Sequence, residues 1–262
     1  MVKGALKASK IYIVPNGYDG KINNFVPPEG DKCQILYTGT LSDYRYDSLL
    51  QALSALKQSS PDLANRLHFY FVGEGTESIA RDAAGLGVSD MITTRGPTSQ
   101  EEIATLSKQA HALLILGRPS TMRGYELFAA AKLFGYLKAG TPIIGVLPDD
   151  ETKKILLGLG VTTVADVDSQ SAIVALLRRL LDAWSQGNLS SLSPKRGACE
   201  IYSAERQTEE LVRALEGKPA LEPFVPGLAQ IPPSLRSKID TIAREFEQKR
   251  SLDTRQHVMT RS

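Results

Sequence analysis

Apolar and polar residues alternate in blocks between residues 34 and 185, and each block has the spacing of a strand or a helix. Short unbroken apolar runs are typical of buried strands, whereas apolar residues that recur every three or four positions are typical of helices. The runs that predict strands are 34–39, 67–73, 91–96, 112–117, 142–147 and 161–167. The stretches that predict helices are 47–56, 76–86, 99–110, 127–138, 150–157, 173–184 and 202–215.

Strands that alternate with helices in this way predict an α/β fold, with parallel strands joined by right-handed crossovers. We therefore expect a doubly wound, Rossmann-like parallel sheet over residues 31–215. Residues 1–30 contain turn signals and read as an extended linker entering that domain. Residues 216–262 begin with a proline-rich stretch and continue as a basic tail, predicted to be partly helical and otherwise disordered.

Composition excludes few classes of protein, because 42% apolar and 23% charged residues are ordinary values for a globular chain of 262 residues. The charge distribution is more informative. Residues 234–262 hold seven Lys and Arg against four Asp and Glu, which leaves 24 against 25 in the rest of the chain. A nearly neutral body argues against a nucleic-acid-binding protein.

The cysteine and histidine positions do not predict a metal site. Cys33 and Cys199 match no metal-ligand spacing, and the three histidines are isolated from them and from each other. Two cysteines far apart are consistent with reduced thiols in a cytoplasmic protein. No apolar run reaches the length of a signal peptide core or a transmembrane segment, so we expect a cytoplasmic chain with no transmembrane segment.

Glycines close four of the predicted strands, at Gly39, Gly73, Gly96 and Gly117. The carboxyl ends of parallel strands meet at one edge of the sheet, where backbone without side chains can approach a bound phosphate or base. Lys132 lies in a helical segment that would start at this same edge. The alternative interpretation is that the glycines only close turns and that Lys132 is an ordinary solvated lysine. For any single position, this alternative is favoured over ligand binding.

Five groups of residues, taken in order, resemble a known family. They are Val14-Pro-Asn-Gly-Tyr-Asp19; Tyr37-Thr-Gly-Thr-Leu41 with Arg45 and Leu49-Leu-Gln-Ala-Leu53; Phe71-Val-Gly-Glu-Gly75; Arg95-Gly-Pro-Thr-Ser99; and Lys132-Leu-Phe-Gly-Tyr-Leu with Ala139-Gly-Thr-Pro142. The set resembles the carboxyl-terminal, nucleotide-sugar-binding half of GT-B fold glycosyltransferases, and most closely the retaining family 4 type. The resemblance covers roughly residues 11–215, and it is the set in this order that makes it specific.

The resemblance implies a nucleotide-diphosphate sugar as donor substrate, with no metal and no other cofactor. Gly39 and Thr40 would bring backbone against the diphosphate and the sugar. Arg45 and Lys132 are the implied catalytic residues, since two fixed cations would hold the diphosphate and stabilise the charge that develops on the leaving group. The other implied binding residues are Gly73, Arg95, Gly96, Leu133 and Tyr136, of which Arg95 and Gly96 match a loop that lines the base pocket.

The sequence departs from the family pattern in two respects. The glutamate that binds the nucleotide ribose in the family is replaced by Gly135, and Glu126 is a weak candidate to substitute for it. Family members also carry an amino-terminal acceptor-binding domain, whereas this sequence begins at the interdomain connection. We therefore expect exposed apolar surface where that half would dock, covered by a separate acceptor-binding chain or by self-association.

Three functions are compatible with these observations. The first is a hexosyltransferase, or its donor-binding half, that acts on a glycan, a glycolipid or a small acceptor. The second is a non-catalytic nucleotide-sugar-binding or scaffold protein, for which the departures argue. A nucleotide-sugar epimerase, which shares the fold, is a third and weaker alternative.

Overall fold

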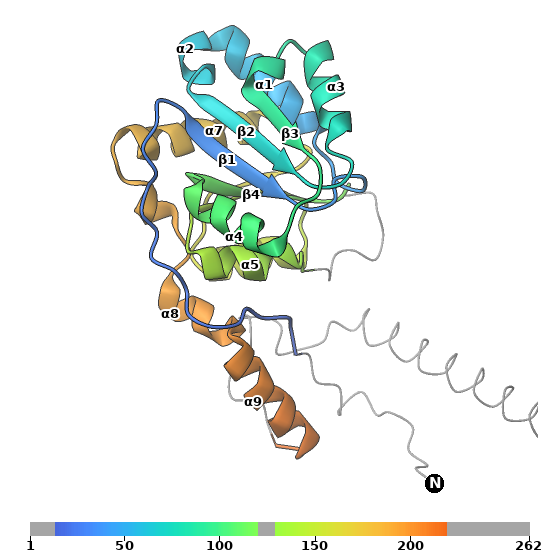
Figure 1. The fold of residues 1–262 in the computed structure, drawn as a ribbon, viewed down its shortest axis with the longest axis vertical. Coiled ribbons are helices and arrows are strands. Elements are labelled where there is room, and N and C mark those ends of the chain that lie inside the picture. Colours follow the sequence, from blue (N-terminus) through green and yellow to red (C-terminus); the bar gives the residue numbers. More distant parts are fainter. Residues whose placement is uncertain (1–13, 120–128, 219–262) are drawn as a thin grey trace, which may run out of the picture. The chain divides into compact units, whose positions relative to one another are not determined.

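The computed structural model describes residues 14–119 and 129–218. Its centre is a parallel sheet of six strands in the order β3-β2-β1-β4-β5-β6. Figure 1 labels four of them, β1 to β4. The strands are β1 (Cys33–Thr38), β2 (Leu67–Val72), β3 (Ile92–Arg95), β4 (Ala112–Leu116), β5 (Ile143–Leu147) and β6 (Val164–Asp166). This order confirms the predicted doubly wound, Rossmann-like fold.

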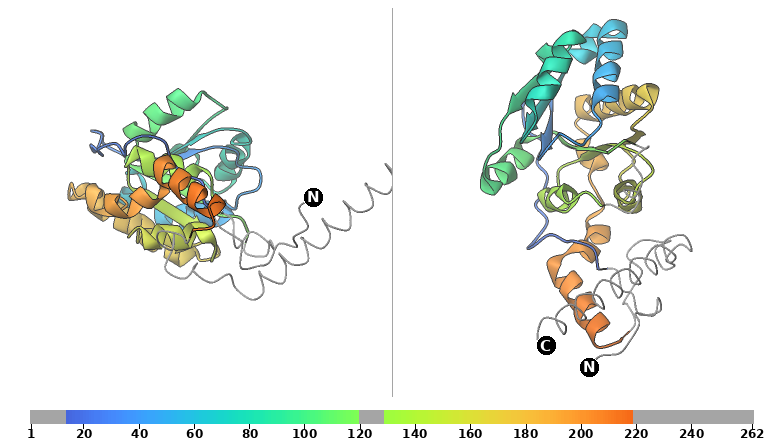
Figure 2. Two further views of the ribbon diagram at one scale, coloured as in Figure 1. Left: turned by 90° about the horizontal axis from the view of Figure 1, so that it is seen from below. Right: turned by 90° about the vertical axis from the view of Figure 1, so that its right-hand side faces the viewer.

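Helices cover both faces of the sheet. The longer ones are α1 (Asp47–Ser59), α3 (Glu77–Gly85), α4 (Gln100–Gln109), α5 (Lys132–Ala139), α6 (Glu151–Gly158), α7 (Gln170–Ser185) and α9 (Ala204–Leu215). Two single-turn helices, α2 (Pro61–Ala64) and α8 (Arg196–Cys199), were not predicted. Helices α1, α3 and α7 lie on one face, and α4 and α5 lie on the other (Figures 1 and 2).

The alternation of side chains along β1 shows how the two faces are filled. Ile35 and Tyr37 belong to a large apolar cluster that includes residues of α1, α3 and α7. Thr38 points to the opposite face, where its backbone N–H donates to the hydroxyl of Tyr136 in α5 at 2.9 Å. β4 is buried at every position, as its unbroken apolar sequence predicts for a sheet covered on both sides.

Helix α5 begins later than the apolar spacing predicts. The spacing from Leu127 predicts a continuous helix, but Leu127 lies outside the described residues and the helix begins at Lys132. The N–H of Ala130 donates instead to the hydroxyl of Thr152, which is in α6. The end of α5 agrees with the prediction, because Gly140 terminates it in the left-handed conformation with φ 73°.

Contacts divide the chain into two compact units, one of residues 16–208 and one of residues 1–15 with 209–262. The larger unit contains the whole sheet and includes residues 16–30 of the segment that was expected to be a linker. Tyr18 is buried there, and its hydroxyl donates to the carbonyl of Cys199 at 3.2 Å. The predicted domain limits at residues 31 and 215 stay predictions.

Candidate functional site

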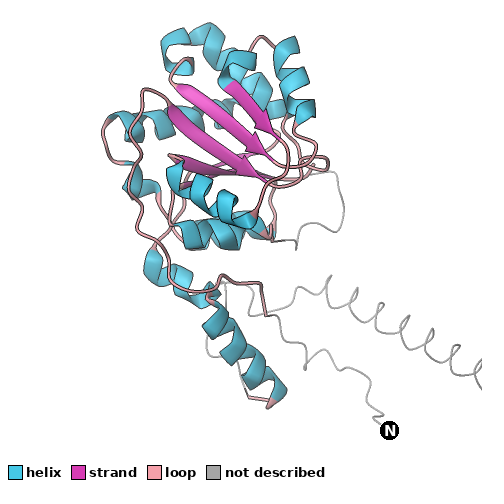
Figure 3. Cartoon of the chain, in the orientation of Figure 1, coloured by secondary structure: helices cyan, strands magenta, loops and turns pink. Residues whose placement is uncertain are grey.

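The strand order places the candidate site between β1 and β4. At this point the crossovers change direction, and doubly wound sheets bind ligands in the crevice outside the carboxyl ends of such strands. The strand ends gather at one edge of the sheet (Figure 3). Gly39 follows β1 here, and Gly117 follows β4. The N–H of Arg45 donates to the carbonyl of Gly117 at 2.9 Å, so a backbone hydrogen bond ties the two loops together.

Lys132, the first residue of α5, places a buried ammonium at this crevice. Its Nζ lies 3.6 Å from the centroid of the Tyr37 ring and 4.7 Å from that of Tyr44. Among the described residues it has no hydrogen-bond partner. Burial lowers the pKa of Lys132 to about 7. The ring faces stabilise the cation, but three N–H donors stay unsatisfied, which is unfavourable unless an anion binds.

The glycines at the strand ends leave little room for side chains. Gly39 has φ 112°, and a Cβ there would lie 3.4 Å from the Lys132 Nζ. A Cβ on Gly73 would collide with the carbonyl oxygen of Gly39. The N–H groups of both glycines are occupied, since they donate to the carbonyls of Val72 and Arg95 at 2.9 Å. Lys132 is therefore a better candidate for binding an anion than these two amides.

Arg118, which the sequence analysis missed, supplies a second cation. It follows Gly117, its Cζ lies 5.5 Å from the Tyr44 ring centroid, and its Nη2 lies 3.6 Å from Oδ2 of Asp43. Tyr44 thus contacts the cations of both Arg118 and Lys132. The signal was present in the sequence, because a basic residue directly after a strand-closing glycine falls at the ligand-binding edge of the sheet.

The Arg45 side chain does not join this group. Its Nε and Nη2 donate to the carboxylate of Asp47, each at 3.0 Å, and its Nη1 lies 2.9 Å from Oδ1 of Asp168. The hydrogen bond with Asp47 raises the pKa of Arg45 and lowers that of Asp47. All three guanidinium nitrogens are engaged with carboxylates, so the predicted pairing of Arg45 with Lys132 around one ligand is not seen.

Three more predicted binding residues are Thr40, Leu133 and Tyr136. Thr40 is exposed to solvent, whereas the other two are buried in α5. Thr40 is exposed beside Gly39, and its carbonyl accepts a hydrogen bond from the Tyr37 hydroxyl at 2.7 Å. Leu133 is fully buried. Tyr136 is buried too, and its hydroxyl is bonded to Thr38. Leu133 and Tyr136 thus pack α5 on the sheet, and their predicted contact with a ligand stays a prediction.

The predicted base-pocket positions lie at the end of the edge strand β3. Arg95 is paired with Glu102 of α4, and its carbonyl accepts from the Gly73 N–H. A Cβ on Gly96 would meet nothing within 4 Å, so no steric contact requires glycine there. Gly135, which replaces the family glutamate, is also open at its Cβ, and Glu126 lies outside the described residues.

Three further features of the described residues bear on function. They contain no group of three or more His, Cys, Asp or Glu side chains arranged to hold a metal ion. None of their helices is both long and apolar enough to cross a membrane. The large apolar side chains that they expose are Val26, Leu86, Leu157, Leu211, Val212 and Leu215. Three of them lie in α9, and the expected apolar docking surface stays a prediction.

Comparisons with known proteins agree with this architecture. No protein-family model matches the chain. A mannosyltransferase of Mycolicibacterium hassiacum, named MMP alpha-(1->4)-mannosyltransferase, is 26% identical over 221 residues, which are 81% of this chain and 49% of that protein. The chain thus spans about half the length of this relative.

Many solved structures are similar to this chain, and two of them are representative. The apo form of the lipopolysaccharide outer core galactosyltransferase WaaB has a TM-score of 0.55 at 19% identity, over 81% of this chain and 57% of that one. The pneumococcal O-GlcNAc transferase GtfA, in complex with UDP and GlcNAc, has a TM-score of 0.51 at 17% identity, over 76% of this chain and 38% of that one. These similarities show the Rossmann-like fold that occurs in GT-B glycosyltransferases.

Proposed function

We propose that this chain binds a nucleotide-diphosphate sugar and serves as the donor-binding half of a retaining GT-B hexosyltransferase of the family 4 type. The observation that carries the proposal is the buried Lys132 ammonium, which has no hydrogen-bond partner among the described residues and lies beside Gly39 at the switch point of the sheet. A diphosphate is a dianionic group with several acceptor oxygens, and it would satisfy the unpaired N–H donors of this lysine.

The same geometry suggests how the protein would assist transfer. When the bond between the hexose and the diphosphate breaks, negative charge accumulates on the leaving diphosphate. Lys132 is already fixed in place, and Arg118 contacts the same Tyr44 ring. Cations held in place before the reaction stabilise such charge without reorganisation, and this would supply the electrostatic role that a metal ion has in other transferases.

The related proteins support this assignment. The relative at 26% identity is named as a mannosyltransferase, and the GtfA structure contains UDP. The proposed acceptor is a glycan, a glycolipid or a small molecule. Because the relatives are about twice as long as the matched region, we propose that a second lobe or a separate chain holds that acceptor.

A second candidate function is nucleotide-sugar binding without turnover. The pairing of Arg45 with Asp47 and Asp168 favours it, because the second predicted diphosphate contact is already neutralised. The two functions differ in one measurement, which is the transfer of labelled hexose from a nucleotide sugar to a saccharide acceptor. Transfer by the purified chain would eliminate the non-catalytic candidate.

Isothermal titration calorimetry with UDP, GDP and their hexose conjugates tests the proposal. We expect one of the two nucleotides to bind and Lys132→Met to weaken its binding at least about tenfold, which corresponds to about 1.4 kcal/mol. Lys138→Met is the matched control, because Lys138 is exposed in the last turn of the same helix. Absence of binding to the intact chain, or equal binding by wild type and Lys132→Met, would contradict the proposal.

A further inference from the structure

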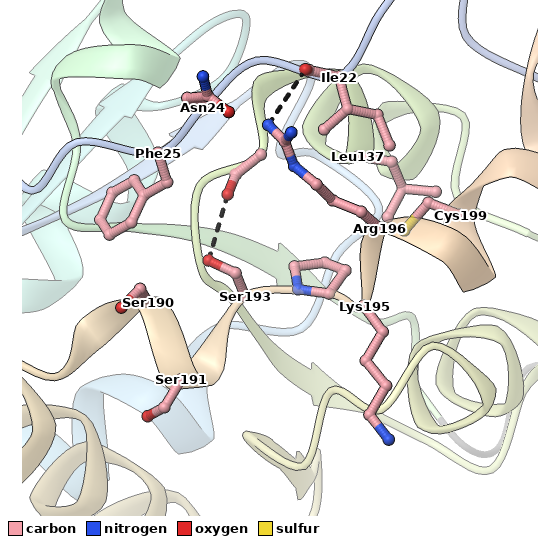
Figure 4. Close-up of a pocket in the computed structure, with 12 residues that line it drawn as sticks. Ile22, Asn24, Phe25, Leu137, Ser190, Ser191, Ser193, Lys195, Arg196 and Cys199 are labelled. Atoms are coloured by element: carbon pink, nitrogen blue, oxygen red, sulfur yellow. Dashed lines mark hydrogen bonds between the residues drawn. The ribbon is translucent and has the colours of Figure 1, made fainter.

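A cavity lies at the carboxyl-terminal end of α5. It has a volume of about 600 Å³ and is bounded by residues 22–25, by the carboxyl-terminal end of α5 and by residues 190–199 (Figure 4). Lys132 begins α5, whereas Leu137 and Gly140 line this cavity. A helix rises about 1.5 Å per residue, so Lys132 and Gly140 are separated by roughly 12 Å along the helix axis. The cavity is therefore distinct from the crevice at the carboxyl edge.

The walls of the cavity combine apolar surfaces with hydroxyl and amide groups and two cationic side chains. Ile22, Phe25 and Leu137 provide the main apolar surfaces. The polar side chains are those of Asn24, Ser190, Ser191, Ser193, Lys195 and Arg196, and no carboxylate is among the lining residues that are described. Without a carboxylate, the cavity is unsuited to a metal ion or an amine.

The hydrogen bonds of the serines indicate what the cavity offers to a ligand. The Ser191 hydroxyl donates to the carbonyl of Asn188 at 2.7 Å, and the Ser193 hydroxyl donates to that of Gly140 at 3.2 Å. Both hydroxyl protons are therefore used within the protein, and only oxygen lone pairs are left for a ligand. At these two serines, a ligand group that donates hydrogen bonds is favoured.

The other polar groups supply hydrogen-bond donors. Asn24 and Ser190 make no side-chain hydrogen bond with any described residue, so the amide and the hydroxyl can each both donate and accept. Arg196 uses its Nη2 to bind the carbonyls of Ile22 and Asn23. Figure 4 shows the Lys195 ammonium pointing away from the three serines, and the Lys195 stem lies where a Cβ on Gly160 would touch it.

We propose that this cavity binds a neutral saccharide unit at a site separate from the sugar-donor crevice. A pyranose ring presents hydroxyl groups that both donate and accept, and it has an apolar face of C–H groups. The serines and Asn24 match the hydroxyls, and Phe25 provides an aromatic surface for the apolar face. The volume also falls within the range of about 300–1,000 Å³ that is usual for small-molecule sites.

Saturation-transfer NMR with the intact chain tests this proposal. The probes are methyl α-glucoside, methyl α-mannoside and maltotriose, each at up to about 50 mM, so that binding with a Kd as weak as about 1 mM is detected. Inorganic phosphate, followed by ³¹P NMR, is the anionic probe. The test variants are Asn24→Ala with Ser190→Ala, and Phe25→Leu, which keeps an apolar side chain but removes the aromatic plane. The matched control is Asn65→Ala with Ser89→Ala, two exposed positions outside the cavity.

We expect saturation transfer to at least one saccharide, a loss of about tenfold or more in its affinity in both test variants, and wild-type affinity in the control. Phosphate should not compete with the saccharide. Thermal melts establish that each variant is folded. The proposal is overturned if no saccharide binds, if the test variants bind as wild type does, or if phosphate displaces the saccharide.

The Lys132→Met variant separates failure of this site from failure of the sugar-donor site. We expect it to bind the saccharide as the wild type does. Loss of saccharide binding in Lys132→Met would place the saccharide in the crevice and overturn the proposal.

Discussion

Lys132 combines an unfavourable contribution to folding with a favourable position for binding. Its ammonium is removed from water and has only the rings of Tyr37 and Tyr44 as partners among the described residues. Burial of a charge without a hydrogen-bonded counterion destabilises a fold. Residues that weaken folding in this way are typical of binding sites, where the ligand supplies the missing partner.

The buried Lys132 ammonium should make the free energy of unfolding depend on pH. Its pKa is about 7 in the folded chain against 10.5 in the ordinary case, so between these values the unfolded chain carries one more proton. Stability should therefore rise with pH in this window and fall as pH drops through the folded-state pKa. Relative to Lys132→Met, we expect the wild-type free energy of unfolding to increase by about 1.4 kcal/mol per pH unit.

Urea denaturation at several pH values between about 7.5 and 9 measures that difference, and Lys138→Met should follow the wild type because its ammonium is exposed. Parallel pH profiles of the wild type and Lys132→Met would show that the ammonium is hydrated in the folded protein.

At the scale of elements, the glycines that follow the strands differ in whether a side chain would fit there. Gly73 has φ 144°, and a Cβ there would collide with Gly39, whereas Gly96 has open space. We expect Gly73→Ala to lower the free energy of unfolding by about 2–4 kcal/mol, because it combines backbone strain with a steric clash. Gly96→Ala should change it by less than about 0.5 kcal/mol. Chemical denaturation of both variants checks this, and equal effects would mean that the loops after β1 and β2 are not in contact.

The same elements show what the sequence could and could not predict. The six strands follow from apolar runs, and the end of α5 follows from Gly140, since these signals are local. The start of α5 depends on a hydrogen bond between Ala130 and Thr152, which lies in the next helix. The orientation of Arg45 depends on Asp168, which is distant in sequence. Long-range polar contacts of this kind leave no periodic pattern in the sequence, so the contact of Arg45 with Asp168 could not be predicted, and the shared role of Arg45 and Lys132 stays a prediction.

For the larger unit as a whole, α5 connects two candidate sites of different chemistry. Lys132 at its first residue faces the crevice suited to a diphosphate, and Leu137 and Gly140 line the cavity suited to a neutral saccharide. The two sites share no residue. The sheet and its covering helices are closely packed around α5, which makes the helix a rigid spacer between them.

Binding at the two sites should therefore be independent. Ligands that bind only the folded state raise its stability, and contributions from separate sites add when the sites are not coupled. We expect the rise in melting temperature with the nucleotide and the saccharide together to equal the combined rises with each alone, and each affinity to be unchanged by the other ligand. Calorimetric titration of one ligand in the presence of the other measures any coupling. A coupling free energy above about 1 kcal/mol would contradict independence, and it would require that α5 shifts or changes its packing when either ligand binds.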